Sequence, residues 1–266
     1  MAKEQTTAAS GTAAQSDADF LDGISGQGYE GIGKEDRAIP FLKILQSNNP
    51  EVNEGDPSTY VQGAKPGVFF NTVTKRIYGA EINLIPLKYE RVWLCWAPNR
   101  GGLRNRVAPN SIHTVGDPFS EEGMQDDEGN DVSDTMTFYC LVADYIDEGV
   151  IVFSLNSSGL RHGKDWNEMI DLNRTPNGKK AAFFGSVWNL KLVSNKNDKG
   201  TWYQFGTKST NASKVRDITK DEFVTSINPG LLLLEAGTAK ADYAQLGGPE
   251  QGAAGADIGK TKDIPF

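Results

Sequence analysis

Cations and aromatic side chains are interleaved in two segments of the chain, residues 69–96 and residues 179–208. Proteins that bind single-stranded nucleic acid use this combination, because lysine and arginine contact the phosphates while bases stack on flat side chains at ~1–3 kcal/mol each. The alternative interpretation is that the aromatic residues form a barrel core and the cations lie on the outer face of the same strands. The candidate residues for nucleic-acid contact are Lys75, Arg76, Tyr78, Lys88, Tyr89, Arg91, Trp93, Arg100, Arg104, Lys179, Lys180, Trp188, Lys191 and Trp202.

The strand-like run 88–96 indicates which face fits this chemistry. Alternate residues of a strand point to opposite faces, so Tyr89, Arg91 and Trp93 share one side. That side combines stacking groups with a phosphate contact. The opposite side carries Val92, Leu94 and Trp96 and is typical of a core.

Charge is unevenly distributed along the chain, although the net value is -8. Residues 65–106 hold eight basic and two acidic residues, and residues 161–216 hold eleven basic and four acidic ones. Between them, residues 117–148 hold eleven acidic residues and no basic one. This asymmetry indicates a charged ligand. We expect the acidic loop 117–131 to be solvated, with mimicry of nucleic acid in the basic groove as a further hypothesis.

Other chemistries find little support in the sequence. The segments GLRHGKD (159–165) and GADIGKT (255–261) resemble a phosphate-binding loop, but each is one residue short, so we expect no nucleotide hydrolysis. No set of nucleophile, base and orienting residue can be assembled, which predicts that the protein is not an enzyme. The two histidines lie far apart, so we expect no metal site and no cofactor. Cys95 and Cys140 lie in apolar runs, where we expect buried thiols without a disulfide.

Strands predominate in the pattern of apolar residues and turns. Short apolar or aromatic runs separated by Gly, Asn and Asp indicate strands, and Pro86 inside the longest run indicates an edge or a bulge. Thr219 and Glu222 have the spacing of a capping box, which predicts the start of a helix. The predicted strands lie within 67–79, 80–98, 135–145, 149–157, 186–194 and 201–209, and the predicted helices cover 163–172 and 218–227.

These elements predict one mainly β domain over residues 37–235, with one or two short helices. A five-stranded open barrel with elaborated loops fits the pattern, and a sandwich fits nearly as well. Residues 1–36 are rich in small and polar side chains, and residues 236–266 in Gly and Ala, so we expect a disordered N-terminal arm and a flexible C-terminal tail. No apolar run is long enough to span a membrane, and the N-terminus lacks the order of a signal peptide. We therefore expect no membrane partner and a cytoplasmic protein.

The tail ends on KTKDIPF, residues 260–266, which places an aromatic residue and the free carboxylate at the end of a polar linker. The proline limits the conformations that are lost on docking. A partner protein with an apolar pocket and a basic residue would capture such an end. The candidate partner-binding residues are Asp263, Ile264, Pro265 and Phe266.

The last four residues resemble the terminal tip of bacterial single-stranded DNA-binding proteins, which recruits replication, recombination and repair enzymes. Lys260 and Lys262 depart from the acidic run that precedes the bacterial tips. The resemblance of the body is to single-stranded DNA-binding proteins of bacteriophages, and it implies an elaborated OB-fold-like open barrel with a flexible tail. The segments that carry it are AIPFLKILQ (38–46), GAKPGVFFNTVTKRIYG (63–79) and YERVWLCWAPNRGG (89–102).

We therefore expect a phage protein that binds single-stranded DNA without sequence preference during replication or recombination, and that recruits partner proteins through its tip. Its location would then be the host cytoplasm. Two alternatives stay open: a phage structural or assembly protein without nucleic-acid binding, and a strand-annealing recombination protein. The pattern carries no signal for the oligomeric state or for a preference between DNA and RNA.

Overall fold

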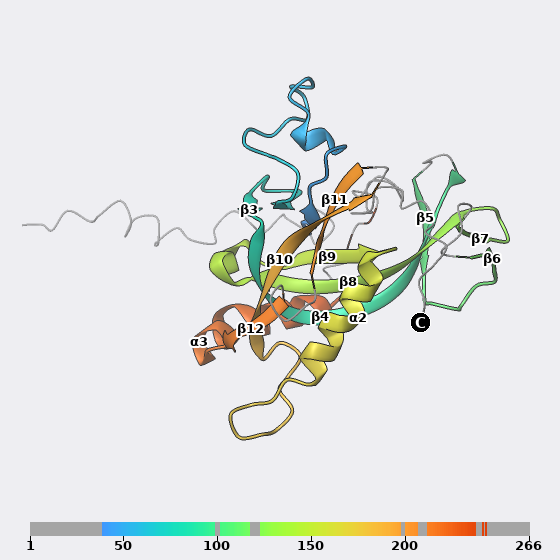
Figure 1. The fold of residues 1–266 in the computed structure, drawn as a ribbon. Coiled ribbons are helices and arrows are strands. Elements are labelled where there is room, and N and C mark those ends of the chain that lie inside the picture. The colour runs from blue at the N-terminus through green and yellow to red at the C-terminus, as the bar shows by residue number, and fades with distance from the viewer. Residues whose placement is uncertain are drawn as a thin grey trace, which may run out of the picture. The chain divides into compact units, whose positions relative to one another are not determined.

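Strands dominate the described part of the chain, with a few short helices (Figure 1). The expectation of a mainly β protein with short helices is confirmed. The chain divides into two units after Arg37, and every described residue belongs to the second unit, Ala38–Phe266. The computed structural model describes residues 39–98, 102–117, 123–197, 200–206 and 212–237, together with Ala241 and Tyr243.

The elements follow one another without internal repeats. The strands are β1 (Leu42–Ile44), β2 (Phe69–Asn71), β3 (Ile77–Gly79), β4 (Glu81–Trp96), β5 (Leu103–Val107), β6 (Thr114–Gly116), β7 (Met124–Asp126), β8 (Asp131–Val142), β9 (Ile151–Asn156), β10 (Ser186–Asn197), β11 (Gly200–Phe205) and β12 (Ala212–Asp217). The helices are the 3-10 helices η1 (Pro50–Val52) and η3 (Ala143–Glu148), the α-helices α2 (Gly159–Asp171), α3 (Lys220–Glu222) and α4 (Asn228–Glu235), and the π-helical turn η4 (Phe223–Ile227).

Two antiparallel sheets are built from these strands. The small sheet has the order β1-β2-β3. The large sheet has the order β11-β10-β4-β8-β7-β6, with β12 beside β10, β5 beside β4 and β9 beside β8. The predicted hairpins of β8 with β9 and of β10 with β11 are both confirmed. Within the described residues neither sheet closes on itself through backbone pairing.

A bulge in β4 changes which of its residues face each side of the sheet. The register between β4 and β8 shifts between Pro86 and Lys88, which confirms the bulge that the proline predicted. Before the bulge, Leu84 lies in one core and Ile85 in the other. After the bulge, Leu94 lies in the same core as Ile85. One extra residue has therefore exchanged the two faces of the strand.

Both faces of the large sheet are covered by helices. Trp166 and Ile170 of α2 pack on one face, and Ile227 and Leu234 of the last helices pack on the other. Burial on both sides explains why most residues of the run 80–98 are apolar, apart from its exposed or half-buried middle, Lys88–Arg91. The α2-side core includes Leu42, Phe69, Leu84, Phe138, Phe153, Trp166, Trp188 and Phe205, and the α4-side core includes Phe41, Ile85, Leu94, Trp96, Tyr139, Leu141, Ile227 and Tyr243.

The packed chain extends beyond residue 235, where the sequence predicts that the domain ends. Ala241 and Tyr243 are 9% and 1% exposed and belong to the α4-side core. The hydroxyl of Tyr243 lies 2.6 Å from Oγ1 of Thr137, so this aromatic residue is both apolar filler and hydrogen-bond partner. One large residue in a Gly/Ala-rich segment leaves the composition almost unchanged, which is why composition places the boundary too early.

The side chain of Gln46 links the small sheet to β11. Gln46 is 6% exposed, and its Nε2 donates to the carbonyl oxygen of Tyr203 at 2.8 Å. The backbone N–H of Tyr203 donates in turn to Oε1 of Gln46, also at 2.8 Å. The side-chain amide of Gln46 therefore pairs with the backbone of β11 as a peptide group of a neighbouring strand would. The small sheet is also linked to β9, because the carbonyl of Pro40, which precedes β1, accepts from the N–H of Val152 at 2.8 Å.

Replacing Gln46 with alanine is expected to lower the free energy of unfolding by about 1–3 kcal/mol, because both backbone groups of Tyr203 lose their partner. Urea unfolding followed by circular dichroism measures the change. Gln62→Ala serves as the control, since Gln62 is exposed and should change the stability by less than about 0.5 kcal/mol. Equal stabilities of the two variants would show that the link contributes nothing.

The C-terminal helices begin with the predicted capping box. The side chain of Thr219 accepts from the N–H of Glu222, and the Glu222 carboxylate accepts from the N–H of Thr219 at 2.8 Å. Arg216 donates to the same carboxylate at 2.8 Å. The bond from Arg216 is the main reason that the pKa of Glu222 is lowered to about 2.

Glu222→Gln is expected to lower the free energy of unfolding by about 1–2 kcal/mol at pH 7, after allowance for the exposure of Arg216. A lowered pKa stabilises the folded chain above the ordinary value near 4.5, and this contribution is lost as the pH falls from there through about 2. Denaturant titrations of both chains at several pH values should therefore show a gap that closes under acid. Asp221→Asn is the control, and a gap independent of pH would contradict the assignment.

Candidate nucleic-acid interface

Lys75 and Arg76 lie in the turn between β2 and β3, beside an exposed aromatic ring of η3. The guanidinium carbon of Arg76 lies 4.2 Å from the ring centroid of Tyr145, and its Nε is paired with the carboxylate of Glu148. Tyr78 donates its hydroxyl to the same carboxylate, and burial together with this bond raises the pKa of Tyr78. The arrangement offers a cation stacked on a ring, which suits a base or a phosphate.

A second cluster gathers around Glu90 on the α4 side of the large sheet. Lys88 Nζ lies 2.7 Å from Oε1 of Glu90, and Arg106 of β5 pairs with Oε2. Tyr139 of β8 donates its hydroxyl to the same carboxylate at 3.3 Å. Burial raises the pKa of Glu90, but the bonds and charges of Lys88 and Arg106 outweigh it and hold that pKa below its usual value. Two positive charges thus share one negative partner.

Three further predicted cations are also paired with carboxylates. Their side chains are about 40–60% exposed. Exposed pairs contribute only ~0–1 kcal/mol, so a phosphate can replace the carboxylate at small cost. The pairs are Arg91 with Asp134, Lys180 with Asp171 and Lys191 with Glu81.

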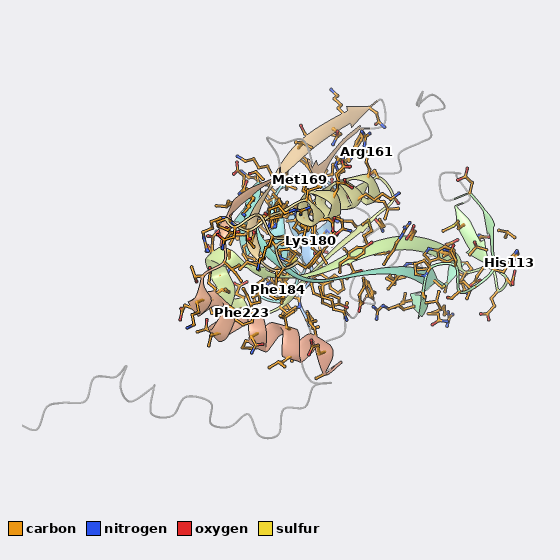
Figure 2. All side chains as sticks on the ribbon, turned by 90° about the horizontal axis from the view of Figure 1, so that it is seen from below. His113, Arg161, Met169, Lys180, Phe184 and Phe223 are labelled. Atoms are coloured by element: carbon orange, nitrogen blue, oxygen red, sulfur yellow. The ribbon has the colours of Figure 1, made fainter. Side chains whose placement is uncertain are left out.

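Three predicted cations, Lys75, Arg104 and Lys179, make no ion pair with another residue of the described ranges, and all three are exposed. The same holds for cations that the sequence analysis did not select. Figure 2 shows that Arg161 and Lys180 lie well away from His113. The additional cations for which the described ranges hold no ion-pair partner include Arg161, Lys164 and Lys196.

The predicted stacking residues differ in accessibility. Trp93 and Trp188 are 8% and 3% exposed, so a base has no access to either ring in this conformation. Tyr89 is half-buried against Phe138, with 5.1 Å between ring centroids, and Trp202 is half-buried on β11. The rings of Tyr89 and Trp202 therefore keep an edge that a base can reach, whereas the rings of the two buried tryptophans do not.

The side of β4 that the sequence predicts for nucleic acid is covered at its far end. Trp93, Cys95 and Val132 form a small core, against which Val107 and Met124 pack. The expectation that Trp93 lies on an open face is therefore wrong, because side chains of β5 and β7 in the same sheet pack against this small core, which strand alternation does not reveal. The expectation that the opposite side is core is confirmed by the burial of Val92, Leu94 and Trp96 in the α4-side core.

The acidic segment 117–131 has regular structure where it is described. β7 pairs with β6 and with the start of β8, and a tight turn joins β7 to β8. In this turn Asp126 accepts from the N–H groups of Glu128 and Asn130, at 3.0 and 2.9 Å. Asp127 pairs with His113 at 2.6 Å, at the far end of the molecule in Figure 2. The segment is thus partly a hairpin, and its mimicry of nucleic acid stays a prediction.

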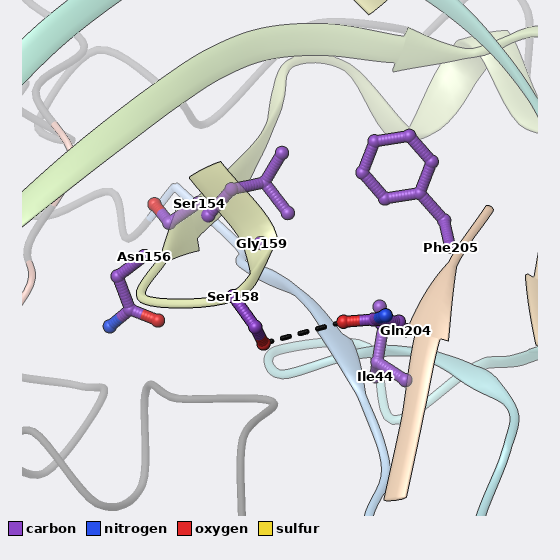
Figure 3. Close-up of a pocket in the computed structure, with 8 residues that line it drawn as sticks. Ile44, Ser154, Asn156, Ser158, Gly159, Gln204 and Phe205 are labelled. Atoms are coloured by element: carbon purple, nitrogen blue, oxygen red, sulfur yellow. Dashed lines mark hydrogen bonds between the residues drawn. The ribbon is translucent and has the colours of Figure 1, made fainter. Parts of the chain in front are cut away.

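An open pocket lies between β9, β11 and the start of α2 (Figure 3). Ile44, Leu155 and Phe205 supply apolar surface. The hydroxyl of Ser158 donates to Oε1 of Gln204 at 3.3 Å across its polar side. No ionisable residue lines the pocket among the residues described, so its chemistry is packing and hydrogen bonding to a neutral or flat group.

Comparison with known families gives one result. The family model described as Pam3 phage gp34-like protein matches residues 8–222, most of the chain. The chain belongs to this family. Its members are phage proteins, which confirms the phage part of the expected assignment. No curated protein and no solved structure matches this gp34-like chain.

Several predicted residues of the gp34-like chain lie outside the described ranges. They are Arg100 in the first basic segment and the partner-binding tip Asp263–Phe266. Among the described residues, no helix is long and apolar enough to cross a membrane.

Tyr145 is one of the residues that the sequence analysis missed in this gp34-like chain. Its ring is 37% exposed and is covered in part by Arg76. The residue lies in η3, three positions after the end of β8, and stands among acidic residues, so neither charge nor strand pattern selects it. The only local signal is an aromatic residue in a turn, where a buried role is uncommon.

Proposed function

We propose that this phage protein binds single-stranded DNA without sequence preference, acts in replication or recombination, and recruits partner proteins through Asp263–Phe266. It performs no chemistry on the strand. The observation that carries the proposal is the order in which five strands pair, together with the position of the helix between them. Charge and accessible aromatic residues add to it.

The pairing order favours an OB-type arrangement. β4 pairs with β8, β8 with β9, and α2 follows β9. β10 then returns to the other edge of β4 and pairs with β11. An OB-fold is a partly open five-stranded Greek-key barrel that binds oligonucleotides on its second and third strands and on the connections from strand 1 to 2 and from strand 4 to 5.

By this correspondence the bound strand would run along β8 and β9. Most side chains of these two strands are buried, so the contacts would come from the neighbouring strands and connections. The flanking connections are residues 97–130 and the turn between β10 and β11. Lys88 of β4, Arg104 of β5 and Lys196 near the end of β10 lie at these places, and all three are exposed. Lys88 also lies 5.9 Å from the ring centroid of Tyr139 in β8. Phosphate contacts from these cations would follow the strand across the face.

Titration of a labelled 30-nucleotide single strand and of its duplex, followed by fluorescence anisotropy at several salt concentrations, tests the proposal. About five phosphate contacts would give a slope of about -3.5 for log affinity against log salt, or a loss of ~100-fold between 50 and 200 mM. The duplex should bind much more weakly. Absence of binding to the single strand at low salt would overturn the proposal.

A phage structural or assembly protein without nucleic-acid binding is the second candidate. The burial of Trp93 and Trp188 and the pairing of most predicted cations with carboxylates favour it. It predicts no affinity for either strand form at any salt concentration. The same titration therefore decides between the two candidates.

A further inference from the structure

Tyr243 fills a site for one aromatic ring on the α4 side of the large sheet. Its ring is 1% exposed and lies beneath the guanidinium of Arg106, 5.6 Å from ring centroid to guanidinium carbon. The ring of Phe41 is its aromatic neighbour, with 5.6 Å between centroids at a tilt of 60°. Oγ1 of Thr137 lies 2.6 Å from the hydroxyl. The site thus offers a cation over the ring, an apolar wall and one hydrogen-bonding group.

The proposed function places the single-stranded DNA along β8, and the Tyr243 site lies against β8. Thr137 belongs to β8, and Arg106 belongs to the connection between β4 and β8. Glu90 pairs with both Arg106 and Lys88, so a second cation lies close to Arg106. A nucleobase has the same requirements as the tyrosine: a flat face for an arginine, and a polar edge for a hydroxyl.

The occupant comes from the segment that follows α4, of which the structure describes Ala241 and Tyr243 beyond residue 237. Tyr243 and Ala241 follow α4, which ends at Glu235, and both lie against the α4-side core. The segment can leave without breaking a strand pairing or a described helix. Its loss would open the outer side of Thr137 and Tyr139 in β8.

We propose that this is an exchangeable aromatic site. Tyr243 occupies it in the free protein, and a base of the bound single strand takes its place, which releases the segment after α4 from the fold. The inference rests on the proposed function and adds a competition at its binding face. Because the strand must displace Tyr243, its apparent affinity is reduced by the fraction of molecules in which the site is filled.

Three variants test the exchange in the anisotropy titration. Tyr243→Ala and a chain that ends at residue 240 should bind the 30-nucleotide single strand about tenfold more tightly, because the competitor is removed. A chain that ends at residue 243 keeps the tyrosine and loses the rest of the tail, so it should stay within about twofold of the full chain. Equal affinities in all four chains would overturn the exchange while leaving the proposed function standing. Absence of binding in all four would overturn both.

A second measurement does not depend on a substitution that could unfold the chain. Hydrogen exchange of the full chain should become faster in residues 236–243 when the single strand is added, since the segment leaves its site. As a separate check, Tyr243→Phe keeps the ring and loses the hydroxyl that lies 2.6 Å from Oγ1 of Thr137, so it should bind the single strand two- to threefold more tightly and still show a cooperative thermal unfolding transition. Slower or unchanged exchange in the segment of the bound full chain would contradict the release.

Discussion

Replacing Trp166 with alanine is expected to lower the free energy of unfolding by about 3–5 kcal/mol. Trp166 is fully buried at the centre of the α2-side core. Its ring centroid lies 4.6 Å from that of Phe138 and 6.1 Å from that of Phe205, so it joins α2 to β8 and β11. Removal leaves a large cavity between rigid strands, which cannot collapse to fill it.

Urea unfolding of the two chains measures this loss. Leu172→Ala is the matched control, because Leu172 ends the same helix with 60% of its surface exposed and should change the stability by less than about 0.5 kcal/mol. Trp166→Phe should lie between the two. A loss below about 1 kcal/mol for Trp166→Ala would mean that α2 does not hold the sheet in the way its contacts indicate.

The second large effect concerns the proposed interface. The triple variant Lys88→Ala, Arg104→Ala and Lys196→Ala is expected to bind single-stranded DNA about 100-fold more weakly at 50 mM salt, at roughly 1 kcal/mol for each lost contact. Its salt slope should fall by about 2, because each phosphate contact contributes about 0.7. Anisotropy titrations over a range of salt concentrations give both numbers.

A matched triple variant removes the same charge from another surface. This variant removes three positive charges from the exposed turn after α2, where Lys180 is paired with Asp171, by the substitutions Arg174→Ala, Lys179→Ala and Lys180→Ala. If the strand follows β8 and β9, this control should lose less than about threefold. If it loses as much as the first triple variant while the first binds normally, the strand runs along the second basic segment, and the placement on β8 and β9 is wrong.

Local signals predict the elements of this fold well. The hairpin of β8 with β9 and the capping box at Thr219 depend only on neighbouring residues, and both are present. The bulge at Pro86 follows from a missing backbone donor, which is also a local property. The start of α2 at Gly159, four residues before the predicted one, reflects a first turn without apolar periodicity.

Long-range contacts limit what the sequence reveals about the site. Arg91 and Trp93 share one side of a strand as predicted, but β5 and β7 cover Trp93, and Asp134 pairs with Arg91. No pattern in the run 88–96 contains these partners, since they come from residues more than ten positions away. The same limitation hides Tyr243, whose role depends on Thr137 and Arg106. Residue types therefore predict which chemistry is possible, whereas the tertiary structure determines which side chains are accessible to solvent.

The bulge divides β4 into two parts in which the alternation of side chains between the two faces has opposite phase. Upstream of Leu87 the even positions belong to one layer of the molecule, and downstream they belong to the other. Deletion of Leu87 alone would remove the bulge and would keep Tyr89–Trp96 on their present faces opposite β8, whereas deletion of one residue elsewhere in β4 would turn the residues beyond it to the other face. Apart from the loss of Leu87, length changes in this family are therefore expected to occur in even steps within β4 and freely in the connections around it.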